Sequence, residues 1–327
     1  MSSQRAIIVG LSGCSSSGKT TLARLLRDIF PNSFVLHEDD FYRPEEELPM
    51  KDGLLDWDCA ESINIPDMEK ALSHIRSEGT FPVSNNVLRP GLRPPKAASS
   101  HAMTAAPPQA TSPTQPPTPR PNRHLRNAYQ TITRLPPEQP FVDSKEDQNS
   151  VGECPASPAK IEAQKLRVRE WLQPGQPGHD LFYPASAPGH ERLRMCLLDG
   201  FLLYSPPKLS AVMDMIDVKL FLQVSRARAT QRREARDGYV TLEGFWKDPP
   251  GYVDKIVWPN YVDAHRWLFA GGHVERGELD RHVLRDNGVL AQDGRPGPGG
   301  GVDLDFEETL EWAVGAVLAA LERWHKG

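Results

Sequence analysis

The stretch that decides the fold is AIIVGLSGCSSSGKTTLARLLRDIF, residues 6–30. Residues 6–11 form a short apolar run rich in β-branched side chains, which predicts a buried strand. Residues 12–18 then form a turn rich in glycine and serine. From residue 19 to residue 30, leucine and isoleucine recur at helical spacing until Pro31-Asn32 ends the pattern. The sequence therefore predicts a strand, a Gly/Ser loop and a helix in immediate succession.

The loop contains the complete pattern G-x-x-x-x-G-K-[ST]. Its glycines permit a tight turn whose backbone N–H groups point at phosphate oxygens, and the following helix adds its positive dipole end. Lys19 can neutralise the β- and γ-phosphates, and the Thr20 hydroxyl can bind Mg²⁺. We therefore predict a nucleotide-binding loop with contacts from Gly13, Ser15, Ser16, Ser17, Gly18, Lys19, Thr20 and Thr21.

Strands and helices alternate along the rest of the chain. Residues 33–36, 195–198 and 218–224 read as strands, and helices are expected over residues 66–79, 227–236 and 305–324. This alternation predicts an α/β fold with a parallel sheet flanked by helices. The last helix has an apolar stripe that is formed by Phe306, Leu310, Val314, Val317, Leu321 and Trp324.

Proline is unusually frequent in the middle of the chain. Of 31 prolines, 19 lie between residues 85 and 188, and residues 84–190 hold only 15 Leu, Ile, Val and Phe in 107 positions. Such a composition is too poor in apolar side chains to bury a core. We therefore predict one P-loop domain formed by residues 1–83 and 191–327, interrupted by a disordered, Pro-rich insertion at residues 84–190. Only residues 159–172 could form an isolated helix there, and removal of the insertion should leave folding and activity largely intact.

Several classes of protein are excluded by composition. A net charge of −5 gives no electrostatic footprint for nucleic acid or anionic membranes. The longest apolar stretch, residues 312–321, has half of the ~20 residues that a membrane span needs, and the apolar run near the N-terminus is too short for a signal peptide. Cys14, Cys59, Cys154 and Cys196 lack zinc-site spacing. We expect a monomer with reduced thiols in the cytoplasm, and conceivably also in the nucleus.

Five stretches together resemble one enzyme family: GLSGCSSSGKTTLARLL, HEDDFY, LDWD, LLDGFLLY and PGYVDKIVWPNY. They are similar to nicotinamide riboside kinases, a branch of the uridine-kinase-like P-loop kinases, over roughly residues 5–82 and 191–269. The resemblance implies a parallel sheet with a mobile lid. It also implies transfer of the γ-phosphate of ATP, with Mg²⁺, to the 5′-hydroxyl of nicotinamide riboside, and conceivably of nicotinic acid riboside, for NAD synthesis. The insertion departs from the compact pattern of this family.

Carboxylates at three positions are candidates for the chemistry. Asp199 follows a predicted buried strand and is the candidate second metal ligand beside Thr20. By resemblance, Asp39 is the base that takes the proton of the 5′-hydroxyl, and Asp40 has a structural or metal-water role. Asp58 resembles the residue that binds the 2′- and 3′-hydroxyls of the ribose, although capping of a helix near Ala60 is an alternative role.

Two arginines and two aromatic residues complete the expected site. By resemblance, Arg233 reaches the ribose, and Arg236 joins Lys19 in stabilising charge on the nucleotide and the transferred phosphoryl group, although the two arginine roles could be exchanged. Trp57 and Tyr239 resemble the aromatic pair that holds the cationic pyridinium ring, since electron-rich ring faces attract cations. Core packing of Trp57 and an exposed position for Tyr239 are the alternatives.

Three other functions are compatible with parts of the sequence. A uridine/cytidine or pantothenate-type kinase would keep Lys19, Thr20 and Asp39 but bind a different base. A GTPase-like regulator would need an N-K-x-D motif, which the sequence lacks, and would not need Asp39. An inactive scaffold could recruit a protein through the extended, Pro-rich residues 113–121, although the intact phosphate loop argues against inactivity.

Overall fold

The computed structural model of the chain describes residues 5–82, 153–183, 192–236, 238–240, 245–292 and 301–326. These residues belong to one compact unit formed by residues 1–88 and 141–327. Most of the predicted insertion, residues 84–152 and 184–190, lies outside the described residues. No helix among the described residues is long and apolar enough to span a membrane.

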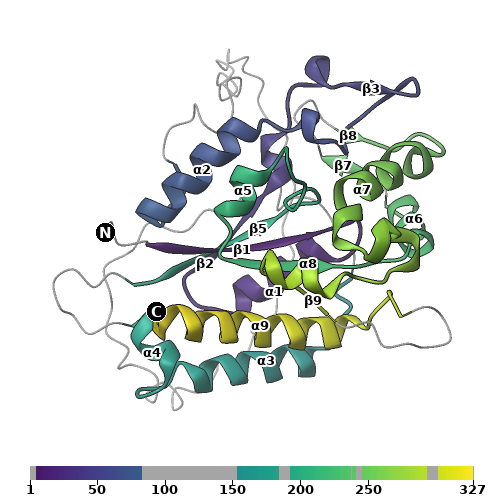
Figure 1. The fold of residues 1–327 in the computed structure, drawn as a ribbon. Helices are drawn as coiled ribbons and strands as arrows, with labels where there is room; N and C mark the ends of the chain where they lie inside the picture. The colour runs from purple at the N-terminus through teal and green to yellow at the C-terminus, as the bar shows by residue number, and fades with distance from the viewer. Residues whose placement is uncertain are drawn as a thin grey trace, which may run out of the picture. The chain divides into compact units, whose positions relative to one another are not determined.

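A five-stranded parallel sheet forms the centre of this unit, with the strand order β2-β5-β1-β6-β9 (Figure 1). This confirms the predicted α/β fold and parallel sheet. The strands are β1 Ala6–Gly13, β2 Ser33–His37, β5 Arg194–Asp199, β6 Val218–Leu222 and β9 Val289–Ala291. Two short antiparallel pairs lie outside this sheet: β3 Met50–Lys51 with β4 Leu54–Leu55, and β7 Tyr239–Val240 with β8 Phe245–Trp246.

The side chains of β1 alternate between two hydrophobic cores, one on each face of the sheet. Ala6 and Ile8 pack in the first core, whereas Ile7, Val9 and Leu11 pack in the second. The helices that supply the first core are α2 Ile65–Glu78, α5 Ser210–Asp214, α6 Arg226–Glu234, α7 Trp258–His265 and α8 Arg281–Asp286. The helices that supply the second core are α1 Lys19–Ile29, α3 Pro158–Trp171, α4 Pro177–Phe182 and α9 Phe306–Lys326.

Local signals in the sequence explain where the longer helices begin and end. The Asn64 side chain accepts a hydrogen bond from the backbone of Asp67 at the start of α2, and Gly79 ends this helix with φ +69°. The Asp305 carboxylate accepts from the backbone N–H groups of Glu307 and Glu308 and so caps α9. Within the apolar stripe of α9, Leu310, Val314, Val317 and Leu321 are buried as expected, and Phe306 is partly buried. Trp324 is 39% exposed because it lies in the last turn, beyond the core.

The predicted insertion contains two helices: α3 coincides with the helix that residues 159–172 could form, although it is not isolated, and α4 was not expected. Both lie inside it and pack on α9, and α3 also packs on α1 (Figure 1). Val168 and Phe182 are fully buried, and the Trp171 indole N–H donates to Glu322 of α9 at 3.0 Å. The low apolar content of the segment did not indicate this packing. A helix needs only a few apolar side chains when the surface that covers them is supplied by other helices of the chain.

Candidate active site

The topology collects the predicted polar residues at one edge of the sheet. In the register of neighbouring strands, His37 of β2 lies beside Asp199 of β5, and Asp199 lies beside Leu11 of β1. Asp39 follows β2 directly, in the short helix Glu38–Phe41, and the phosphate loop follows β1. Parallel strands thus bring Asp39, Asp199 and the loop to the carboxyl edge of the sheet, where ligands bind in open α/β folds.

The phosphate loop has the strained backbone that its glycines were expected to permit. Gly13 has φ +141°, and a Cβ there would lie 2.1 Å from the carbonyl oxygen of Leu222. Gly18, immediately before α1, has φ +100°. Ser16 also adopts a positive φ, +64°, which costs energy for a residue other than glycine. Such strain is typical of a loop shaped for a ligand.

Several polar side chains of the phosphate loop make no hydrogen bond to a described residue outside the loop. The buried hydroxyls of Ser12, Ser16 and Ser17 have no hydrogen-bond partner among the described residues. The Lys19 ammonium, 7% exposed, donates to the carbonyl of Cys14 in its own loop at 2.9 Å. Buried polar atoms without partners are rare in folded proteins. The loop therefore fits a phosphate chain, whose oxygens can accept from these groups.

The two predicted metal ligands lie in direct contact. The Thr20 hydroxyl donates to Oδ2 of Asp199 at 2.5 Å, and Nδ1 of His37 lies 3.0 Å from the same oxygen. Burial alone would raise the pKa of Asp199, but His37, Lys19 and Thr20 hold it below its usual value. Burial opposes protonation of His37, yet the hydrogen bond and charge of Asp199 raise its pKa to about 9. The carboxylate at this position is thus ionised.

A hydroxyl and a carboxylate are a suitable donor pair for Mg²⁺, which takes one or two protein oxygens and completes its shell with phosphates and water. Within the described ranges, no three His, Cys, Asp or Glu side chains are grouped so that they could hold a metal ion by themselves. The donor set of Thr20 and Asp199 therefore fits a cation that arrives with a nucleotide.

The carboxylate of Asp39 is available to bind a substrate. Its side chain makes no hydrogen bond or ion pair with any described residue, and it is only partly buried. Burial, together with the nearby negative charge of Asp199, raises the pKa of Asp39 to about 6. A carboxylate with a raised pKa and no partner, beside a phosphate loop, has the properties of a general base.

Glu38 was missed by sequence reasoning. Its side chain is fully buried, and Oε2 accepts from the backbone N–H groups of Phe201 at 2.6 Å and Leu202 at 3.1 Å. Glu38 thus ties the end of β2 to the turn that follows β5, and it fixes the segments that carry Asp39 and Asp199. The only signal in the sequence was a third acid directly at the end of the strand.

Asp58 and Arg233 are brought together by the structure. The guanidinium of Arg233 donates to both carboxylate oxygens of Asp58, at 2.9 and 3.1 Å, and the two side chains are each 6% exposed. Arg233 also donates to the Ser15 hydroxyl at 2.8 Å. The Asp58 side chain does not cap the short helix Ala60–Ser62. Arg233 therefore links the phosphate loop to the predicted ribose-binding residue.

The other arginines of α6 differ in their positions. Arg232, which the sequence analysis did not select, donates to the carbonyl of Ser16 in the phosphate loop at 3.1 Å. Arg236 lies just beyond α6, with its guanidinium 4.7 Å from the ring centre of Tyr239. The contacts to the loop thus come from Arg232 and Arg233, and the predicted phosphate contact of Arg236 stays a prediction.

Trp57 lies in a cluster of aromatic rings. Its ring centre is 5.2 Å from that of Tyr42 and 5.8 Å from that of Trp246, and Trp246 also contacts Tyr252. Tyr239 instead lies against the guanidinium groups of Arg233 and Arg236. The described ring of the segment after α6 that contacts Trp57 is thus that of Trp246, and the role of Tyr239 opposite Trp57 across a bound base stays a prediction. Sequence reasoning missed Trp246 because it lies outside the quoted motifs, four positions before the motif PGYVDKIVWPNY begins.

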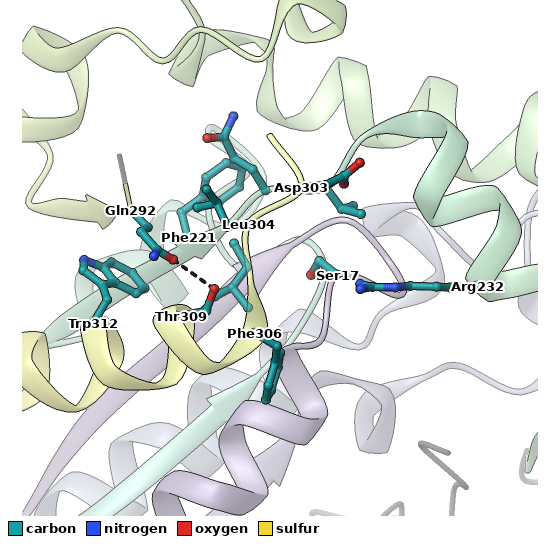
Figure 2. A pocket seen from close by; sticks show the side chains of 12 residues that line it. Ser17, Phe221, Arg232, Gln292, Asp303, Leu304, Phe306, Thr309 and Trp312 are labelled. Carbon is teal, nitrogen blue, oxygen red and sulfur yellow. Dashed lines mark hydrogen bonds between the residues drawn. The ribbon is translucent and has the colours of Figure 1, made fainter. Parts of the chain in front are cut away.

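A pocket lies beside the phosphate loop, and Figure 2 shows its lining. Arg232 and Ser17 form one side, Phe221 lies at its base, and Phe306 and Trp312 come from the start of α9. Thr309 donates to Gln292 across 2.9 Å within the same wall. A flat aromatic group could lie against these apolar side chains next to the loop. None of these residues except Ser17 was selected from the sequence, since they come from four separate segments.

Comparison with known proteins identifies the family. Nicotinamide riboside kinase of Schizosaccharomyces pombe is 30% identical over 319 residues, which cover 98% of this chain and 99% of that protein. The chain belongs to the nicotinamide riboside kinase family. The Saccharomyces cerevisiae nicotinamide riboside kinase is 27% identical over 320 residues, covering 97% of this chain and 98% of its own. No family model matches the chain.

The matches to the relatives differ in how much of each chain they cover. Human nicotinamide riboside kinase 1 is 43% identical over 70 residues, which cover 21% of this chain and 35% of that kinase. The S. pombe kinase, in contrast, aligns over nearly the full length of both chains. That residues 84–190 depart from the compact family pattern stays a prediction. The relatives do not favour the pyrimidine-type, pantothenate-type or regulatory alternatives.

Proposed function

We propose that this chain transfers the γ-phosphate of ATP to the 5′-hydroxyl of nicotinamide riboside, producing the mononucleotide for NAD synthesis. The observation that supports this function is the carboxylate of Asp39, which has no hydrogen-bond partner among the described residues and lies within the electrostatic influence of Asp199 and of Lys19 in the phosphate loop. Phosphoryl transfer requires positioning and charge neutralisation more than covalent chemistry. The phosphate loop would position and neutralise the triphosphate, and the Asp58–Arg233 pair would position the riboside.

On the phosphate side, the loop binds and orients the triphosphate. Its serine hydroxyls and backbone N–H groups would donate to the phosphate oxygens, and Lys19 would exchange the Cys14 carbonyl for the β- and γ-phosphates. Thr20 and Asp199 would hold Mg²⁺, which neutralises charge on the phosphates when bound. Arg236, from the segment after α6, would reach the transferred group.

The pocket beside the loop would hold the adenine of ATP. It adjoins Ser17, which follows the part of the loop that binds phosphate, and its walls include Phe306 and Trp312. The guanidinium of Arg232, anchored on the Ser16 carbonyl, provides a planar cation at the edge of this pocket. A planar cation stacks favourably on an aromatic base.

On the riboside side, Asp39 would accept the hydrogen bond of the 5′-hydroxyl and take its proton as the phosphoryl group transfers. Asp58 and Arg233 would bind the 2′- and 3′-hydroxyls, since a carboxylate accepts from and a guanidinium donates to them. The indole N–H of Trp57 and the hydroxyl of Tyr239 are buried without partners. They are suitable donors to the carboxamide of the nicotinamide, or to the carboxylate of nicotinic acid riboside.

A panel of ribosides tests this function. The purified chain would be incubated with ATP and Mg²⁺ and with nicotinamide riboside, nicotinic acid riboside, uridine or cytidine, and 5′-monophosphates would be measured. We expect the two pyridine ribosides to be phosphorylated far more efficiently than the pyrimidine nucleosides. A preference for uridine would contradict the proposal and favour a pyrimidine nucleoside kinase.

A further inference from the structure

Asp248 connects two side chains of the riboside site that the proposed function treats separately. Its Oδ2 accepts from Nε of Arg233 at 2.6 Å, and its Oδ1 accepts from the indole N–H of Trp246 at 3.0 Å. Asp248 lies two residues after β8, and its side chain is 16% exposed. One carboxylate therefore fixes both the arginine that contacts Asp58 and the tryptophan that faces Trp57.

The charges of this group do not balance. Asp58 and Asp248 each carry a negative charge, whereas Arg233, which bridges them, carries one positive charge. Burial raises the pKa of Asp58, and the negative charges of Asp248 and Asp56 raise it further against the opposing effect of Arg233. The hydrogen-bonded trio thus holds an excess of one negative charge in a largely buried position, where such an excess is unfavourable.

The aromatic rings next to the trio define where a ligand would meet this charge. The ring centres of Trp57 and Trp246 are 5.8 Å apart at an interplanar angle of 53°. The Trp57 backbone is held by the Tyr252 hydroxyl, whereas the Trp246 indole is held by Asp248. Asp248 joins Arg233, the partner of Asp58, to Trp246. The base of a riboside bound at Asp58 would therefore lie against these two rings.

We propose that Asp248 determines the preference of this kinase for a riboside with a cationic base, through its negative charge and through its hold on Trp246. This inference rests on the proposed function. The permanent positive charge of the pyridinium ring offsets the excess charge of the trio, and the two indole faces stabilise the same cation. A neutral base of the same shape would gain the packing but not the charge.

Two substrates of nearly equal shape separate charge from packing. Nicotinamide riboside carries the cationic ring, and its reduced 1,4-dihydro form carries an uncharged one with the same ribose and carboxamide. The ratio of kcat/KM for the cationic form to that for the uncharged form would be measured with Asp248→Asn. Removal of a unit charge next to the ring, at an effective dielectric constant of ~20, should lower this ratio by roughly tenfold or more.

Two further variants distinguish charge from structure. Asp248→Glu keeps the charge, so it should retain the ratio of the unmodified chain even if both rates fall. Asp254→Asn removes a carboxylate that is exposed on the surface, paired with Arg226, and it should leave the ratio unchanged. Thermal unfolding and ATP binding of every variant would establish that each is folded.

The outcomes are distinct. A loss confined to the cationic substrate in Asp248→Asn and absent in Asp248→Glu supports the inference. Equal losses for both ribosides, or an unchanged ratio, overturn it while the proposed function stands. Failure of the unmodified chain to phosphorylate either pyridine riboside, with activity on uridine, overturns the proposed function itself, and it would be observed before any variant is compared.

Discussion

The ammonium of Lys19 donates to the carbonyl oxygen of Cys14 at 2.9 Å, so the cation of the phosphate loop is held over the loop that carries it. The two residues are five positions apart in the sequence, and the loop between them bends through Ser16 at φ +64°. The same bend leaves the hydroxyls of Ser16 and Ser17 without partners. The loop therefore has its positive charge in place before a nucleotide binds.

Lys19→Ala should reduce phosphoryl transfer by at least ~10²-fold, the usual loss when one preorganised electrostatic contact to a transition state is removed. The assay is the steady-state rate of mononucleotide formation at saturating riboside. Lys70→Ala changes an exposed lysine of α2 and should leave the rate unaltered. A folded Lys19→Ala protein with normal turnover would refute the assignment of the loop.

Asp39→Asn should lower kcat by ~10²–10⁴-fold, as is typical for loss of a general base, while ATP binding changes little because Asp39 does not contact the phosphate loop. Turnover and ATP affinity would be measured separately. Asp40→Asn serves as the neighbouring control and should have a much smaller effect. If instead Asp40→Asn caused the larger loss, the base would have to be reassigned to Asp40.

Trp57→Ala should weaken nicotinamide riboside more than uncharged ribosides, by up to ~30-fold, the upper range of a desolvated cation–π contact. Trp57→Phe retains an aromatic face and should recover part of the loss. The measurement is kcat/KM for each substrate, with ATP affinity as the check on the rest of the site. Equal losses for charged and uncharged bases would remove the specific role of the ring.

His265 should make the stability of the chain sensitive to acid. Burial lowers its pKa to about 4, whereas the unfolded chain has a histidine pKa of ~6.5. The unfolded state therefore binds the extra proton first, so stability is full above pH ~6.5 and falls as the pH decreases towards 4. At pH 5 the loss should be about 2 kcal/mol.

The measurement is the unfolding free energy in denaturant at pH 7 and pH 5. His265→Leu should lose about 2 kcal/mol of this pH dependence relative to the unmodified chain. His282→Gln, which changes an exposed histidine of α8, should keep the pH dependence of the unmodified chain. The same acid sensitivity in His265→Leu as in the unmodified chain would show that other groups cause it.

Deletion of part of the middle segment should be tolerated, unlike deletion of all of it. Replacement of residues 84–150 by a short linker should preserve folding and activity, because loop-closure entropy varies slowly with length. Extension of the deletion to residue 190 removes α3 and α4 and should lower the melting temperature strongly. Loss of the buried Phe182 ring alone, in Phe182→Ala, should cost ~3–5 kcal/mol.

The control for the last change is Leu166→Ala, since Leu166 is 52% exposed on α3 and should contribute little. Thermal unfolding of the four proteins, with turnover measured alongside, distinguishes the cases. If the chain without residues 84–190 were as stable and active as the full chain, the packing of α3 and α4 would have no energetic role.

The parts of the fold that were predictable carry their own local signals. The sheet could be predicted because β1 and β5 are continuous apolar runs, and α2 because Pro66 and Gly79 mark its ends. The phosphate loop was identified because its function requires glycine at fixed positions. In each case, the residues that determine the local structure lie within about fifteen consecutive positions.

The parts that were missed depend on residues distant in the sequence. The helix α3 was expected as an isolated helix, but its packing was not. Its buried face is formed by Gln164, Val168 and Trp171, and the surface that covers this face comes from α1 and α9. In the sequence, Glu38 cannot be distinguished from the two acids that follow it, and only its contacts with Phe201 and Leu202 show its role. Trp246 and Asp248 gain their roles from Trp57 and Arg233, and no spacing rule joins these four residues.

Helix α9 takes part in two separate regions of the molecule. Its first turns carry Phe306, Thr309 and Trp312 into the pocket beside the phosphate loop, and its far end receives the indole N–H of Trp171. A rigid helix transmits a displacement at one end to the other. The helices α3 and α4 thus support the helix that lines the pocket proposed for ATP, and we expect their loosening to raise the KM for ATP before it alters the chemical step.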